Sequence, residues 1–180
     1  MNTPNKLTVL RMILVPFFMA FLMQENTLCR TIALVIFIIA SITDAIDGHL
    51  ARSRNQITTF GKFMDPIADK MLTTSAFVVL LSLGRMSSWA LMIILVREFT
   101  VSGIRLLAAA KGTVIAASMS GKIKTVSQMV AIIAAIALLN PFFEESSAKI
   151  ITDILIWIST IAAAVSGIEY VAKNRGLLKE

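Results

Sequence analysis

The hydrophobic positions of the chain fall into six long runs, and most polar residues lie between them. A helix needs roughly 20 apolar residues to cross a bilayer. The runs are continuous rather than alternating, which argues against a transmembrane barrel, and an open strand cannot satisfy its backbone in lipid. We therefore predict an all-α integral membrane protein, a six-transmembrane-helix bundle with spans at residues 7–24, 30–46, 63–83, 88–110, 121–140 and 149–171.

Composition supports this fold class. The 180 residues are 57% hydrophobic and 16% charged, whereas soluble domains average about half apolar and about a quarter charged. Such hydrophobicity excludes a disordered chain, and six spans leave no room for a separate soluble domain. We expect one membrane domain over residues 1–180, and no cleaved signal because no A-x-A-like site follows the first run.

Basic residues are distributed unevenly between the two ends of the predicted bundle. Of the 17 Lys and Arg residues, all but Arg30, Arg85 and Lys149 fall at the termini, in the second and fourth connections, or on the flanking helix ends. The positive-inside rule then places both termini in the cytoplasm. The net charge of +6 points to anionic lipids of the cytoplasmic (inner) membrane and not to nucleic acid.

Four aspartates interrupt the apolar pattern between residues 44 and 70. Asp44 and Asp47 are spaced i, i+3, and Asp65 and Asp69 are spaced i, i+4, so each pair shares one helix face. Each carboxylate near bilayer depth costs about 2.5–3.5 kcal/mol. Two helices joined by a short loop are antiparallel neighbours. We therefore expect the two pairs to face each other at the cytoplasmic end.

Two divalent cations would offset four converging carboxylates. Carboxylate oxygens suit Mg²⁺ or Mn²⁺, and two neighbouring metals are a common arrangement for phosphoryl transfer. Gly48 and Gly61 would let a ligand approach the backbone, while Arg52 could bind a phosphate oxygen. Pro66 is either a first-turn proline after an Asp65 cap or the site of a kink.

These residues spell D-x2-D-G-x2-A-R-x8-G-x3-D-x3-D, matched at Asp44, Asp47, Gly48, Ala51, Arg52, Gly61, Asp65 and Asp69. The motif resembles that of the CDP-alcohol phosphotransferase family of membrane enzymes. The similarity extends along most of the chain, through NKLTVLRMILVPFF, DPIADK, REFTVSGIRLLAAAKG and IAASMSGKIKT. These longer stretches are similar to the family members that use glycerol 3-phosphate.

The resemblance implies transfer of a phosphatidyl group from CDP-diacylglycerol to an alcohol, with release of CMP. It makes Asp44, Asp47 and Asp65 metal ligands, and Asp69 a ligand that is also the general base for the attacking hydroxyl. The residues implied at the CDP-diacylglycerol site are Gly48, Ala51, Arg52, Thr58 and Gly61, with Asn5 and Thr8 as weaker candidates.

The acceptor implied by the resemblance is sn-glycerol 3-phosphate, which would give phosphatidylglycerol phosphate. Its phosphate needs cations near the metals, and the first candidates are Arg105 and Lys124. Further candidates are Lys122, Arg97 and Arg11. Small residues in the last three runs suit either close helix packing or a dimer face. We expect a homodimer.

Other interpretations stay open at this point. The same reaction could use another acceptor, such as inositol phosphate or serine, and a remote alternative is a divalent-cation transporter. Arg54, Lys62 and Lys70 are interpreted as positive-inside anchors. Attraction to lipid headgroups is an alternative role for Arg105, Lys122 and Lys124. Arg97 and Glu98 could simply pair with each other's neighbours inside the bundle.

Overall fold

Six helices form in the predicted order, and the described residues contain no strand. The structure, a computed structural model, describes residues 3–53, 59–113, 115–116 and 118–178. The side chains of residues 3–5, 44–53, 59–63, 65, 66, 69, 177 and 178 lie outside that description. The helices are α1 (Thr3–Leu22), α2 (Thr27–Ser53), α3 (Thr59–Ser82), α4 (Ser88–Ala110), α5 (Met119–Ala137) and α6 (Glu145–Lys173), followed by the short η1 (Arg175–Leu178).

Local chemistry explains where several helices begin and end. The Ser87 hydroxyl caps α4 by accepting from the backbone N–H of Trp89, and the Ser118 hydroxyl caps α5 by accepting from that of Gly121. Gly84 and Gly112 follow α3 and α4 with φ of +67° and +73°. This left-handed conformation favours glycine, so the two predicted breakers end their helices.

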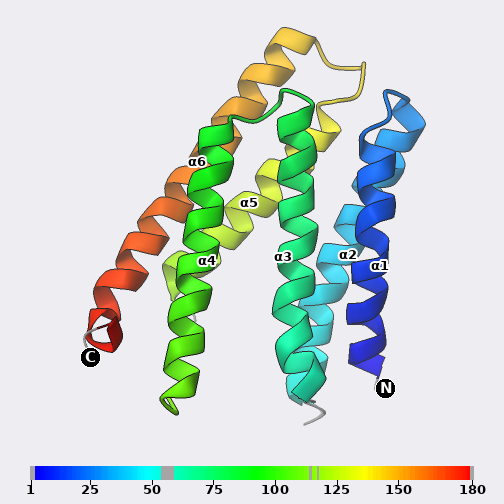
Figure 1. Ribbon diagram of the computed structural model, residues 1–180. Coiled ribbons are helices and arrows are strands. Elements are labelled where there is room, and N and C mark those ends of the chain that lie inside the picture. Colours follow the sequence, from blue (N-terminus) through cyan, green and yellow to red (C-terminus); the bar gives the residue numbers. More distant parts are fainter. Residues whose placement is uncertain (1–2, 54–58, 114, 117, 179–180) are drawn as a thin grey trace.

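Successive helices run in opposite directions (Figure 1). The connections after α1, α3 and α5 gather at one end of the bundle. The chain termini, the end of α2, the start of α3 and the connection after α4 lie toward the other end, which we call the motif end. Helix α1 packs against α2 and α3, α5 packs against α2, α3 and α6, and α4 packs chiefly against α6. Both termini therefore lie toward the same end of the bundle.

The main hydrophobic core lies between these helices. Phe18 of α1 meets Phe37 of α2 with ring centroids 5.7 Å apart, and Phe77, Leu80 and Ile132 are buried beside them. A second, smaller core is formed by Val101, Ile104 and Tyr170 with Ile115 and Val171. This second core joins the C-terminal halves of α4 and α6.

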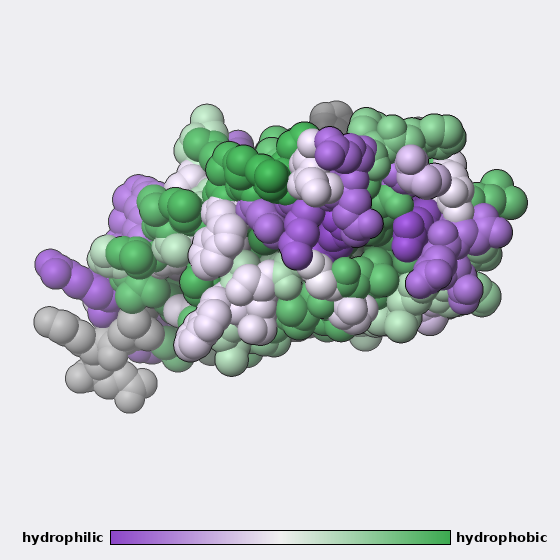
Figure 2. Space-filling view, turned by 90° about the horizontal axis from the view of Figure 1, so that it is seen from above, coloured by the Kyte–Doolittle hydropathy of each residue, from purple (hydrophilic) through white to green (hydrophobic). Residues whose placement is uncertain are grey.

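Large apolar side chains also cover much of the outer surface, among them Ile13, Phe99 and Ile161. Within the described residues, α5 and α6 are long and apolar enough to cross a membrane, and α2 and α3 contain shorter apolar helical stretches. Figure 2 shows the end opposite the motif end, where polar residues gather between apolar patches. Exposed apolar area on this scale is typical of a surface in contact with lipid or protein.

Both aspartate helices extend beyond the predicted apolar runs. Helix α2 continues past residue 46 to Ser53, and α3 begins at Thr59, ahead of residue 63. The predicted spans ended where the apolar runs give way to the aspartates, although the backbone is still helical there. Pro66 consequently lies inside α3, so the interpretation of Pro66 as a first-turn proline after an Asp65 cap is wrong.

Candidate active site

The four aspartates lie on α2 and α3 at matching depths. Asp47 is six residues before the end of α2, and Asp65 is six residues after the start of α3. At a rise of about 1.5 Å per residue, both lie about 9 Å along the helix from the connection. Asp44 and Asp69 both lie about 14–15 Å from it. Two antiparallel helices therefore carry both pairs in register.

The donor set at these positions fits hard divalent cations, because all four ligands would be carboxylates. The helical spacing within each pair is confirmed by the backbone of α2 and α3. The side chains of Asp44, Asp47, Asp65 and Asp69 lie outside the described part of the structure. Their convergence on two metals accordingly stays a prediction.

The predicted CDP-diacylglycerol residues lie on three helices that contact one another. Helix α2 carries Gly48, Ala51 and Arg52, α3 carries Gly61, and α1 carries Asn5, all without described side chains. Thr58 falls outside the described residues. On α1, Thr8 and Arg11 are buried on one inward face. Because α1 packs against α2 and α3, this face lies toward the aspartate helices.

A cluster of charged side chains is centred on Glu98 of α4. The Glu98 carboxylate pairs with Lys124 of α5 and accepts from the Arg97 Nη1, 3.4 Å away. All three side chains are at most 15% exposed. The expectation that Arg97 and Glu98 pair with their neighbours inside the bundle is confirmed. A carboxylate that binds two cations offsets much of the cost of burying them.

Arg97 lies between α4, α5 and α6, where Gly167 leaves room for it. Its Nη2 donates to the Ser166 hydroxyl at 2.8 Å. A Cβ on Gly167 would lie 2.8 Å from the Arg97 Cγ, and a Cβ on Gly121 would lie 3.6 Å from Nη2. The absent side chain at Gly167 is therefore what lets the guanidinium reach Ser166.

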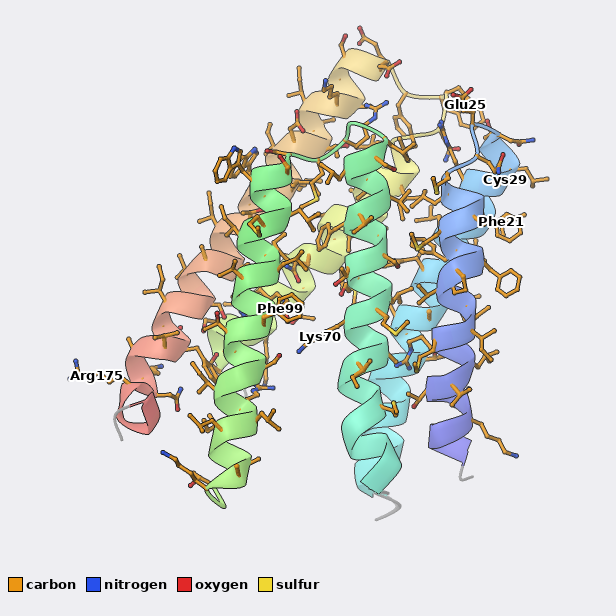
Figure 3. The ribbon with its side chains drawn as sticks, in the orientation of Figure 1. Phe21, Glu25, Cys29, Lys70, Phe99 and Arg175 are labelled. Carbon is orange, nitrogen blue, oxygen red and sulfur yellow. The ribbon has the colours of Figure 1, made fainter. Side chains whose placement is uncertain are left out.

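Lys70 connects the aspartate helix α3 to α4, the helix that carries Arg97 and Glu98. Lys70 directly follows Asp69, and its Nζ donates to the Ser102 hydroxyl of α4, which in turn donates to the Glu98 carbonyl at 2.6 Å. Figure 3 shows Lys70 extending from α3 toward α4. The interpretation of Lys70 as a positive-inside anchor stays a prediction, and the structure adds that its ammonium contacts α4. We call Lys70, Ser102 and Glu98 the α3–α4 bridge.

The other predicted acceptor residues are dispersed. Arg105 is exposed on α4, and its Nε donates to the Tyr170 hydroxyl of α6 at 3.2 Å. Lys122 is exposed on α5, whereas Lys124 is buried. Residues two apart on a helix point in different directions, so the backbone separates these two lysines.

Sequence reasoning missed the partners of the cations: Ser102, Ser166 and Tyr170. Only Glu98 had a sequence signal that could have identified its role, because it is the one acidic residue between 88 and 110. Hydroxyl groups inside apolar runs carry no comparable signal.

The described contacts of the cations on α3, α4 and α5 are of two kinds. Arg97 and Lys124 pair with the Glu98 carboxylate, whereas Lys70 and Arg105 donate to the hydroxyls of Ser102 and Tyr170. One turn from Lys124, the buried Gln128 Nε2 has no hydrogen-bond partner among the described residues. Cations beside a spare donor are suited to an anion such as a phosphate group.

Comparisons with known proteins agree with this chemistry. Residues 1–165 match the family described as CDP-alcohol phosphatidyltransferase. The chain is 39% identical to the CDP-diacylglycerol–glycerol-3-phosphate 3-phosphatidyltransferase of Bacillus subtilis strain 168, over 99% of this chain and 97% of that protein. It is 35% identical to a protein of the same name from Rickettsia typhi, over 94% of each chain. It is 39% identical to the "Probable phosphatidylglycerophosphate synthase" of Mycobacterium tuberculosis H37Rv, over 96% of this chain and 81% of that protein.

Proposed function

Because this chain belongs to the CDP-alcohol phosphatidyltransferase family, we propose that it transfers the phosphatidyl group of CDP-diacylglycerol to sn-glycerol 3-phosphate. The products are phosphatidylglycerol phosphate and CMP. The relatives whose names state this reaction align with nearly the whole chain. The observation that carries the proposal is the α3–α4 bridge, which ties the helix of Asp65 and Asp69 to a basic cluster suited to a phosphate.

The chemistry exchanges a phosphoanhydride bond for a phosphate ester bond. The acceptor hydroxyl oxygen bonds to the phosphorus that carries diacylglycerol, while the pyrophosphate P–O bond breaks and CMP leaves with its electron pair. Asp69 accepts the hydroxyl proton, as a nearby carboxylate can. Asp44, Asp47, Asp65 and Asp69 would hold two divalent cations, Mg²⁺ or Mn²⁺, which supply positive charge to the reacting phosphates.

The donor would lie against α1, α2 and α3. Gly48, Ala51, Arg52, Thr58 and Gly61 are proposed to contact the CDP-diacylglycerol head, with Asn5 and Thr8 beside them. The burial of Thr8 on the inward face of α1 supports this site, because α1 contacts both aspartate helices.

The acceptor phosphate would lie on the basic cluster. Lys124 and Arg105 remain the first candidates, and Arg97 joins them because Glu98 binds both Arg97 and Lys124. Arg11 is a further candidate on the inward face of α1. The exposure of Lys122 favours contact with anionic headgroups for that residue instead.

We propose six spans in the cytoplasmic (inner) membrane, with the motif end and both termini facing the cytoplasm. The alternating helices and the exposed apolar surface support this topology. A homodimer is proposed as the working form, and the exposed small residues Ala109 and Ala110 of α4 offer a surface for close helix contact.

An acceptor panel tests the reaction. Detergent-solubilised protein is mixed with labelled CDP-diacylglycerol, Mg²⁺ and one acceptor: glycerol 3-phosphate, inositol phosphate or serine. We expect CMP release and a labelled lipid product with glycerol 3-phosphate, loss of both with EDTA, and recovery with Mg²⁺ or Mn²⁺. If inositol phosphate or serine gives product and glycerol 3-phosphate does not, the assignment of glycerol 3-phosphate as the acceptor is overturned. Metal flux into proteoliposomes without CMP release would favour a transporter.

Two lysines of one helix test the acceptor site. Lys124→Met should raise the KM for glycerol 3-phosphate about tenfold or more, because a hydrogen bond to a charged group is worth about 1.5–3 kcal/mol. Lys122→Met, the matched control, should change it less than twofold. Equal effects of the two variants would contradict an acceptor site on the basic cluster.

A further inference from the structure

Tyr170 is the one tyrosine of the chain, and it lies in the last turns of α6. We infer that Tyr170 is a positioning residue, whose hydroxyl orients Arg105 toward the phosphate of the acceptor. This inference rests on the proposed function, because it takes Arg105 as a ligand of that phosphate. It adds a side chain that lacks charge and lies outside the aspartate motif.

The tyrosine ring is fixed by packing. It is 3% exposed and sits in the second core between Val101 and Ile104 of α4, with Ile115 and Val171 packed against them. A ring held on several sides has little rotamer freedom, so its hydroxyl occupies a defined point. A buried tyrosine hydroxyl normally has a hydrogen-bond partner, and here that partner is Arg105.

Tyr170 binds Arg105 in two ways. The hydroxyl accepts from the Arg105 Nε at 3.2 Å, and the guanidinium carbon lies 5.7 Å from the ring centroid, within cation–π range. An arginine has many rotamers, and ordering it costs conformational entropy. Two contacts from one rigid ring therefore preorganise a side chain that would otherwise sample many positions on an exposed helix face.

The choice of Nε as the donor matters for binding an anion. A guanidinium has five N–H donors, and both Nη groups belong to its outer edge. No described residue bonds to either Nη of Arg105. Anchoring through Nε thus leaves two parallel donors for a phosphate, which is the bidentate arrangement that arginine makes with this group.

Phenylalanine isolates the role of the hydroxyl because it fills nearly the same volume. We expect Tyr170→Phe to raise the KM for glycerol 3-phosphate about three- to tenfold, the range of one ordinary hydrogen bond, because the hydroxyl acts on the phosphate only through Arg105. The kcat and the KM for CDP-diacylglycerol should stay within twofold of the parent, with an unchanged melting temperature in detergent. Tyr170→Leu, which also removes the ring, should raise the acceptor KM further.

Ser159→Ala is the matched control. Ser159 is a fully buried hydroxyl of α6 that donates to the carbonyl of Ile156 in its own helix. Its removal should leave the acceptor KM unchanged. A similar rise in Ser159→Ala and Tyr170→Phe would assign the effect to general helix stability and overturn the inference.

Arg105→Met separates this inference from the proposed acceptor site. A raised acceptor KM in Arg105→Met, with no further rise in Arg105→Met/Tyr170→Phe, would support Tyr170 acting through Arg105. A raised KM in Arg105→Met with parental kinetics in Tyr170→Phe would overturn the inference alone. An unchanged acceptor KM in Arg105→Met would exclude Arg105 from the acceptor site. It would overturn both the assignment of Arg105 as a phosphate ligand and the inference about Tyr170.

Discussion

At the scale of single residues, the surroundings of each cation distinguish its role better than its charge does. Lys124 and Lys122 are two positions apart on α5, yet Lys124 is buried against Glu98 and Lys122 is exposed. Arg97 reaches Ser166 through the space that Gly167 leaves. The basic residues of this region therefore divide into those buried against partners within the protein and those exposed on its surface.

Asp69→Asn should abolish turnover and leave part of the CDP-diacylglycerol binding. The amide keeps the size of the carboxylate but cannot accept the hydroxyl proton, and general bases contribute roughly 10²–10⁴ in rate. CMP release measures turnover, and binding of labelled donor to protein in nanodiscs is the control. Full activity in this variant would exclude Asp69 as the base.

Gly167→Ala should reduce activity while the helix itself remains intact. The added Cβ would lie 2.8 Å from the Arg97 Cγ, close to the root of that side chain, so Arg97 must move away from Ser166. Overpacking of this kind costs about 1–3 kcal/mol. We expect a fall of about tenfold in kcat/KM for glycerol 3-phosphate.

Gly103→Ala is the control for Gly167→Ala. Gly103 lies on an exposed face of α4, and a Cβ there would meet no atom within 4 Å. Alanine should stabilise this helix by about 0.5–1 kcal/mol and leave kcat/KM unchanged. An equal loss of activity in both variants would show that displacement of Arg97 is not the cause of the loss.

At the scale of helices and their connections, the end opposite the motif end is held by arginines. Arg30 of α2 donates through Nε to the carbonyl of Gln24 at 3.1 Å and through Nη1 to that of Leu139 at 2.7 Å. It thus ties the α1–α2 connection to the end of α5. Arg85 pairs with Glu145 at 3.0 Å, joining the α3–α4 connection to the start of α6.

Arg30→Met should lower the free energy of unfolding by about 1.5–3 kcal/mol, because two charge-assisted bonds to carbonyls are lost. Arg85→Met should lower it by at most about 1 kcal/mol, since its partner Glu145 is 85% exposed. Unfolding of the purified proteins in detergent, followed by circular dichroism, gives both values. A larger loss in Arg85→Met would reverse this ranking of the two contacts.

At the scale of the whole molecule, alternating helices separate two chemically different ends. The motif end contains the end of α2, the start of α3, both termini and the α4–α5 connection. Cys29 lies toward the opposite end (Figure 3). If every helix crosses the membrane, residues at the two ends must face different compartments. The separation therefore makes the proposed topology testable with a single thiol.

Cys29 should react with a membrane-impermeant maleimide added to intact cells, because it is the one cysteine of the chain and is free in the structure. A Cys29→Ala/Gly176→Cys variant should react only after the membrane is permeabilised, since Gly176 is exposed near the C-terminus. Gel-shift of the labelled protein reports both. Labelling of both positions from the outside would exclude the six-span arrangement.

The sequence by itself determined the helix number, the helix order and the register of the aspartates. Run length and i, i+3 or i, i+4 spacing are local properties, so residues 88–110 were predicted with the same ends as α4. The end of α2 and the start of α3 were missed because the polar residues around the aspartates are typical of a loop. The resemblance to the family was found from the same local motif, and the family model matches residues 1–165.

Only the tertiary structure decided which cations share a site and what binds them. Arg105 and Tyr170 are 65 positions apart, and Arg97 and Ser166 are 69 apart. Such contacts depend on how α4 and α6 pack, on the clearance at Gly167, and on which side of each helix is buried. Hydrophobic periodicity indicates where a helix forms. The pairing of side chains between helices is decided only when the faces of several helices pack together.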